Sequence, residues 1–80
     1  MLEKALASVL KELRNRRRLS QEGLAFRADL HRTYISQLER CLKSPGLETL
    51  YKISTALELK LSTLLGMIEK ELEQDRAKQR

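Results

Sequence analysis

Four hydrogen-bonding side chains share one face of a helix near the middle of this 80-residue chain. They are Arg32, Thr33, Ser36 and Gln37, and their spacing of i, i+1, i+4 and i+5 places them together on an α-helix. Arginine can bond two atoms of guanine, glutamine can do the same with adenine, and the threonine methyl can contact that of thymine. A helix that carries them outward could read base edges in a DNA groove. The alternative is an ordinary solvated face of an amphipathic helix.

The segment that must position this face is SQEGLAFRADLHRTYISQLE, from Ser20 to Glu39. Its apolar spacing predicts two short amphipathic helices, the second over about residues 31–39, joined by a tight turn around Asp29. The helix-turn-helix unit is expected to span residues 20–40. Its apolar positions are Leu24, Ala25, Ala28, Leu30, Ile35 and Leu38.

The starts of these two helices carry different capping signals. Ser20 is a suitable N-cap for the first helix, but Gly23 stands where a capping box would have Glu or Gln. Nothing in the sequence accounts for this glycine. His31 is a poor N-cap for the second helix, and as a lone histidine it fits a surface or turn role near the phosphates better than a metal site.

Three further helices are expected around this segment. Apolar residues recur at helical spacing over residues 2–16, 47–57 and 61–74, and the charged tail from Glu73 to Arg80 is expected to fray. Gly and Pro are scarce whereas Leu, Lys, Glu and Arg are abundant, which favours helix. We therefore expect an all-α fold of five helices. Residues 1–80 should form one domain, because two would each lack a sufficient core.

Positive charge is concentrated in the N-terminal half of the chain. Residues 1–45 hold ten Lys and Arg against five Asp and Glu, whereas residues 46–80 hold six of each. This asymmetry favours an anionic partner, with nucleic acid the leading candidate. A membrane surface is disfavoured, because the chain has no Trp and one Phe to anchor in lipid.

Several classes of protein are disfavoured by the composition. One cysteine, Cys41, cannot form an internal disulfide and fits a reducing compartment. We find no apolar run long enough to span a membrane and no secretory signal, so a cytoplasmic location is expected. The sequence also shows no nucleophile–base pair, phosphate loop or metal cluster. We therefore expect no enzyme activity, no cofactor, no metal and no small-molecule effector.

The order of these signals resembles the Xre/Cro-type helix-turn-helix family of phage repressors and bacterial regulators. The resemblance rests on LSQEGLAFRADLHRTYISQLER, then KSPGLETL, then KISTALELKLSTLL, and it covers about Val9 to Leu65. HRTYISQLER also resembles the recognition segment of restriction–modification controller proteins. Two positions depart from the family: Asp29 and Cys41 stand where glycine is usual. Cysteine at a positive φ would cost roughly 1 kcal/mol.

The resemblance implies roles for residues outside the polar face. It implies that Gln21 contacts a DNA phosphate and that Arg14 forms an ion pair with Glu39. In this docking mode the helix over 31–39 enters the major groove, and neighbouring residues contact the DNA backbone. Tyr34 fits either the core or a phosphate contact. The other candidates for backbone contact are Arg40, Lys43 and Ser44.

A single module of this size reads too few base pairs for high specificity. A homodimer on an inverted repeat of double-stranded DNA would read twice as many base pairs and so supply the missing specificity. The C-terminal helix over 61–74 is the expected dimerisation surface, although its apolar stripe could instead fold back onto the first helix. That stripe consists of Leu61, Leu65, Ile68 and Leu72.

Together these features predict a sequence-specific transcriptional regulator that binds operator DNA as a dimer. Whether it represses or activates cannot be read from the contact face. The alternative is a protein-interaction module, such as an antitoxin or adaptor, that uses the same fold without reading DNA.

Overall fold

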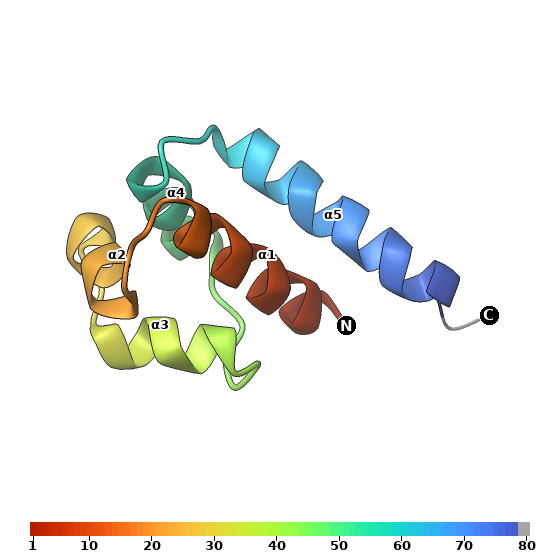
Figure 1. Cartoon of the computed structure of the whole chain (residues 1–80), viewed down its shortest axis with the longest axis horizontal. Helices are drawn as coiled ribbons and strands as arrows, with labels where there is room; N and C mark the ends of the chain where they lie inside the picture. Colours follow the sequence, from red (N-terminus) through yellow and green to blue (C-terminus); the bar gives the residue numbers. More distant parts are fainter. Residues whose placement is uncertain (79–80) are drawn as a thin grey trace.

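The computed structural model describes residues 1–78, which form five helices joined by short loops (Figure 1). The part of the chain that it describes contains no β-strand, and the predicted all-α fold is confirmed. The frayed tail expected from Glu73 to Arg80 is wrong for residues 73–78, because the last helix continues to Lys78. Residues 79–80 lie outside the described part of the chain. The helices are α1 (Leu2–Arg16), α2 (Gln21–Ala28), α3 (Arg32–Glu39), α4 (Leu47–Ala56) and α5 (Leu61–Lys78).

A shared hydrophobic core joins the five helices. Burying a leucine or isoleucine side chain contributes about 1.5–3 kcal/mol, so this core is the main source of stability. The side chains of α2 and α3 in it fix the orientation of the helix-turn-helix against α1 and α4. The largest fully buried apolar residues are Leu10, Leu24, Ile35, Leu38, Ile53, Leu57 and Leu64.

Helix α5 lies antiparallel to α1 and packs along it (Figure 1). As a result, Ile68 is only 6% exposed and Leu72 packs against the core. The assignment of Ile68 to a dimer surface is therefore wrong, because its side chain is already covered within one chain. Ile68 and Leu72 instead follow the alternative, in which the apolar stripe folds back onto the first helix. Leu65 stays 40% exposed, and Leu61 is half-buried.

The first four helices end in the same way, with a left-handed residue that is not glycine and then a leucine. In each, the leucine N–H donates to the carbonyl five residues earlier, as from Leu30 to Ala25 and from Leu42 to Gln37, both at 2.9 Å. This pattern is the Schellman motif. Asp29 and Cys41 thus keep the turn geometry at a cost of roughly 1 kcal/mol each. The left-handed residues are Arg18, Asp29, Cys41 and Glu58, with φ between 55° and 61°.

The structure also accounts for Gly23. The Ser20 hydroxyl caps α2 by accepting the Gly23 N–H at 2.9 Å. A Cβ on Gly23 would lie 3.2 Å from that hydroxyl oxygen and 3.5 Å from the Leu19 side chain. A Cβ here would require the Ser20 hydroxyl to shift by a few tenths of an ångström, so glycine fits this cap without adjustment.

Candidate nucleic-acid interface

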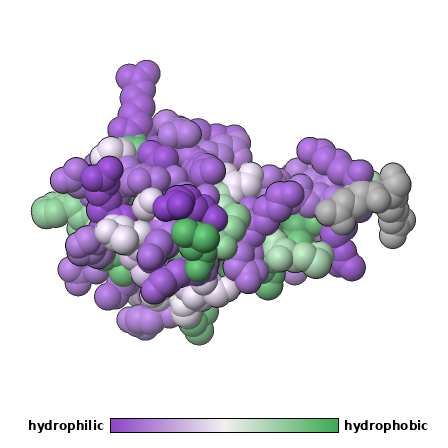
Figure 2. Space-filling model, turned by 90° about the horizontal axis from the view of Figure 1, so that it is seen from below, coloured by the Kyte–Doolittle hydropathy of each residue, from purple (hydrophilic) through white to green (hydrophobic). Residues whose placement is uncertain are grey.

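The N-terminal end of α3 carries the most accessible of the predicted base-reading residues. Arg32 and Thr33 are exposed, whereas Ser36 and Gln37 are half-buried. The opposite side of α3 is anchored by Ile35 and Leu38, which are fully buried. The face of the molecule on which α3 lies is mainly hydrophilic, with small separate hydrophobic patches (Figure 2). The buried side of α3 thus anchors the helix in the core, and its polar N-terminal end faces solvent.

His31 caps this helix, contrary to the expectation from capping preferences. Its Nδ1 accepts a hydrogen bond from the Thr33 N–H at 3.1 Å, and its backbone is extended, with φ −77° and ψ 141°. Histidine ranks below Ser, Thr, Asp and Asn at this position. Sequence reasoning missed this role because the ranking describes average preference and contains nothing about the local geometry.

An ion pair fixes the far end of α3 to α1. Arg14 donates from Nε to Glu39 Oε2 at 2.7 Å and from Nη2 to Oε1 at 3.0 Å. The Arg14 side chain is 15% exposed and that of Glu39 is 2% exposed. The hydrogen bonds with Glu39 raise the pKa of Arg14, so the guanidinium remains charged. A buried fork of this kind holds α3 at a defined angle to α1.

The same carboxylate also binds Gln21, the residue expected to contact a phosphate. Gln21 Nε2 donates to Glu39 Oε1 at 3.1 Å, and the Gln21 side chain is half-buried at the first position of α2. Arg14 also donates from Nη1 to the carbonyl of Leu19 at 2.8 Å. The pair therefore links α1, the start of α2 and the end of α3.

Two exposed cations follow α3, and one of them lies near Tyr34 of that helix. Arg40 and Lys43 are exposed, and the Lys43 ammonium lies 5.8 Å from the centroid of the Tyr34 ring. Tyr34 is half-buried and packs against the core, so it serves the core and carries a cation on its face. Lys43 and Arg40 remain accessible to a phosphate.

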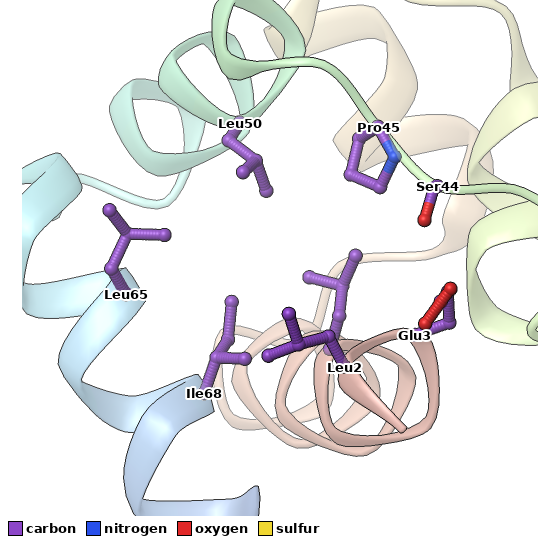
Figure 3. A pocket seen from close by; sticks show the side chains of 8 residues that line it. Leu2, Glu3, Ser44, Pro45, Leu50, Leu65 and Ile68 are labelled. Atoms are coloured by element: carbon purple, nitrogen blue, oxygen red, sulfur yellow. The ribbon is translucent and has the colours of Figure 1, made fainter.

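Ser44 follows Lys43 in the chain and lines an apolar pocket. It faces Glu3, whose pKa is lowered chiefly by a backbone hydrogen bond and then by the Ser44 hydroxyl (Figure 3). A carboxylate beside Ser44 disfavours a phosphate at the same place. Ser44 therefore differs from Arg40 and Lys43 in having a carboxylate beside it.

The apolar pocket has a volume of about 160 Å³ and is bounded by α1, α4, the loop before α4, and α5 (Figure 3). Glu3 and Ser44 are its only polar lining residues, which offers little to orient a polar ligand. Leu65 reaches the pocket from α5 and is partly exposed there. The apolar lining residues are Leu2, Leu6, Pro45, Leu50, Leu65 and Ile68.

Residues 1–78 contain no group of three His, Cys, Asp or Glu side chains placed so as to hold a metal ion. None of their helices has the length and hydropathy needed to cross a membrane. Cys41 is a free thiol at the surface. The polar end of α3 and the residues around it are thus the leading candidate site.

This arrangement, two short helices at a fixed angle with a polar outer helix, defines a helix-turn-helix protein. The helix-turn-helix family model matches residues 10–64, and the chain belongs to this family of DNA-binding transcriptional regulators. The resemblance to the Xre/Cro-type family is confirmed.

Relatives include control proteins. The chain is 51% identical over 47 residues to the control protein C.BamHI of Bacillus amyloliquefaciens, a match covering 59% of this chain and 58% of that protein. It is 46% identical over 63 residues to the control protein C.MunI of Mycoplasma sp, covering 78% of this chain and 85% of that protein. The match thus spans less than two thirds of the length of C.BamHI but most of C.MunI.

A solved structure of the restriction-modification controller protein C.Esp1396I is also similar. It is a tetramer in complex with its natural 35 base-pair operator. The identity is 32% and the TM-score is 0.82, and the match covers 89% of this chain and 93% of that chain. The likeness to controller proteins expected from HRTYISQLER is therefore confirmed.

Proposed function

We propose that this protein is a transcriptional regulator that binds operator DNA sequence-specifically, as a homodimer, with α3 in the major groove. The observation that carries the proposal is the exposed pair Arg32 and Thr33 at the start of a helix whose other end is clamped by Arg14 and Glu39. Recognition helices of this class contact base edges through their N-terminal residues. A similar controller protein binds its natural operator, which supports the same role here.

Base reading and phosphate binding are assigned to different residues. Arg32 and Thr33 read bases from the exposed end of α3, and Gln37 and Ser36 complete that face from half-buried positions. Arg40 and Lys43 supply phosphate contacts that fix the register without carrying sequence information. Tyr34 and Ser44 are weaker candidates for phosphate contact, because the first serves the core and the second lies beside Glu3.

Gln21 is suited to a phosphate contact by its bond to Glu39. A glutamine amide has two N–H donors, and Glu39 Oε1 accepts one of them. The second hydrogen is left for a phosphate oxygen at the start of α2, where the helix dipole favours an anion. Glu39 therefore positions Gln21 as well as Arg14.

Dimerisation would place two copies of α3 on successive half-sites about one DNA turn, roughly 34 Å, apart. The exposed part of the interface is assigned to Leu65, with Leu61 beside it on α5 and the apolar pocket adjoining. Leu72 packs largely within its own chain. Residues 1–80 act together as one DNA-binding domain in this proposal, in the cytoplasm and with no catalytic step.

The proposal is tested by selecting bound duplexes from a random pool with the full chain. An enriched inverted repeat is the expected result. Arg32→Ala should then relax the choice at one base position by about 1–3 kcal/mol, whereas Lys43→Ala should weaken all duplexes nearly uniformly and reduce the salt dependence. Lys43→Ala is the matched control, since it removes a cation just beyond the same helix. Equal losses for Arg32→Ala on selected and random duplexes would refute direct base reading.

A second outcome would favour the alternative class. If the protein binds no duplex at about 50 mM salt, where phosphate contacts are strong, it is a protein-interaction module instead. Phe26, which is 87% exposed on α2, is the side chain that such a module would offer to a protein partner.

A further inference from the structure

His31 occupies an unusual position, because it caps the recognition helix and is itself exposed. Its Nδ1 accepts the Thr33 N–H. A ring nitrogen that accepts a hydrogen bond carries no proton, and in the neutral imidazole the proton must then sit on Nε2. The cap therefore fixes the tautomer and makes Nε2 a hydrogen-bond donor.

Capping alone does not require this residue. Serine or aspartate would cap α3 at least as well, but serine is too short to reach beyond the cap and aspartate would add a negative charge. Histidine caps with one nitrogen and keeps a neutral donor on the other side of a rigid ring. The side chain is exposed and directly precedes Arg32, at the helix end assigned to the groove.

We propose that His31 is a further DNA-contacting residue, whose Nε2–H donates to an acceptor oxygen or nitrogen of the DNA while Nδ1 caps α3. This inference rests on the proposed function and extends it to a residue outside the polar face. The DNA acceptor belongs either to a base edge in the major groove or to a phosphate, both of which carry suitable lone pairs.

The test compares His31→Ser with the wild-type chain. Serine keeps the cap but removes the distant donor, so the thermal midpoint should hold or rise while affinity for the selected duplex falls about tenfold, the value of one hydrogen bond. His31→Ala removes both functions and should lower the midpoint as well. Undiminished affinity of His31→Ser for the selected duplex would overturn the inference.

The two sources of the acceptor are separated by repeating the titration on a random duplex. A base contact predicts that the loss is confined to the selected sequence, whereas a phosphate contact predicts equal losses on both. Failure of the proposed function gives a different result, namely that the wild-type chain enriches no sequence and binds no duplex.

A measurement on the unmodified protein tests the tautomer directly. Imidazole nitrogen chemical shifts should show a protonated Nε2 and an unprotonated Nδ1 in the free chain near neutral pH. A proton on Nδ1 would contradict both the cap and the donor, whatever the variants show.

Discussion

Replacing Glu39 with glutamine should destabilise the protein far more than its small change in shape suggests. The carboxylate is 2% exposed and accepts three hydrogen bonds, two from Arg14 and one from Gln21. Glutamine keeps one acceptor oxygen but turns an NH₂ group toward the guanidinium. Arg14, only 15% exposed, then loses its counter-charge.

The expected loss follows from the burial of the pair. Removing one partner of a buried ion pair typically costs about 3–5 kcal/mol. Because Arg14 retains some solvent contact and the amide oxygen still accepts, we expect about 2–3 kcal/mol. An 80-residue domain has roughly 4–12 kcal/mol in total, and each kcal/mol shifts the midpoint by about 4–8 °C. The thermal midpoint should therefore fall by about 10–20 °C.

A surface pair in α1, the helix that carries Arg14, provides the matched control. Arg16 and Glu12 form an i, i+4 pair at 2.6 Å with side chains 64% and 59% exposed. Glu12→Gln makes the same chemical change there and should cost less than about 0.5 kcal/mol. Urea unfolding followed by circular dichroism measures both variants. The slope with denaturant should remain unchanged if the native fold is retained.

A double-mutant cycle isolates the pair itself. Arg14→Met combined with Glu39→Gln should be less destabilised than the sum of the two single variants, because neither charge is then left without its partner. If Glu39→Gln costs no more than Glu12→Gln, the ion pair does not clamp α3 and the reasoning fails.

Three further predictions concern the turn, the last helix and the phosphate contact. Cys41→Gly should raise the unfolding free energy by about 0.5–1 kcal/mol, since glycine adopts φ 61° without strain; a lower thermal midpoint would contradict this. Ile68→Ala should cost about 2–5 kcal/mol in urea unfolding, whereas Leu65→Ala should instead weaken self-association in sedimentation equilibrium; a large stability loss with unchanged association for Leu65→Ala would reverse these assignments. Gln21→Ala should weaken selected and random duplexes alike, and a loss confined to the selected duplex would instead mean base reading.

The helices were predictable because apolar periodicity survives in a single sequence. Residues 2–16 carry an uninterrupted stripe, and α1 has those bounds. The end of α5 was not predictable, since every residue after Glu73 except Ala77 is charged or polar, which leaves no periodic apolar signal. The stripe of α5 also could not reveal its partner. A leucine or isoleucine at helical spacing can pack equally well in a core or in a dimer interface. Only the packing of α5 against α1 shows that Ile68 belongs to the core.

The candidate site residues were predictable where side-chain type and helical spacing are enough to indicate an exposed position. Arg32 and Thr33 are exposed at the start of α3, as the spacing requires. Glu39 was different. Its charge alone predicts a solvent-exposed side chain, and only the family resemblance indicated an ion pair with Arg14. The cap by His31 and the bond between Gln21 and Glu39 depend on distances between separate elements, which no local pattern encodes.

The repeated helix ending has a consequence for how quickly the regulator becomes active. Each of the first four helices is closed by hydrogen bonds spanning only three to five residues, as from Leu19 to Arg14. A small helical fold with such local contacts is expected to form in microseconds to milliseconds. Folding is then far faster than protein synthesis, which adds about 5–20 residues per second. For the proposed dimer, the delay between synthesis and occupied DNA is therefore set by the encounter of two chains, which depends on their concentration.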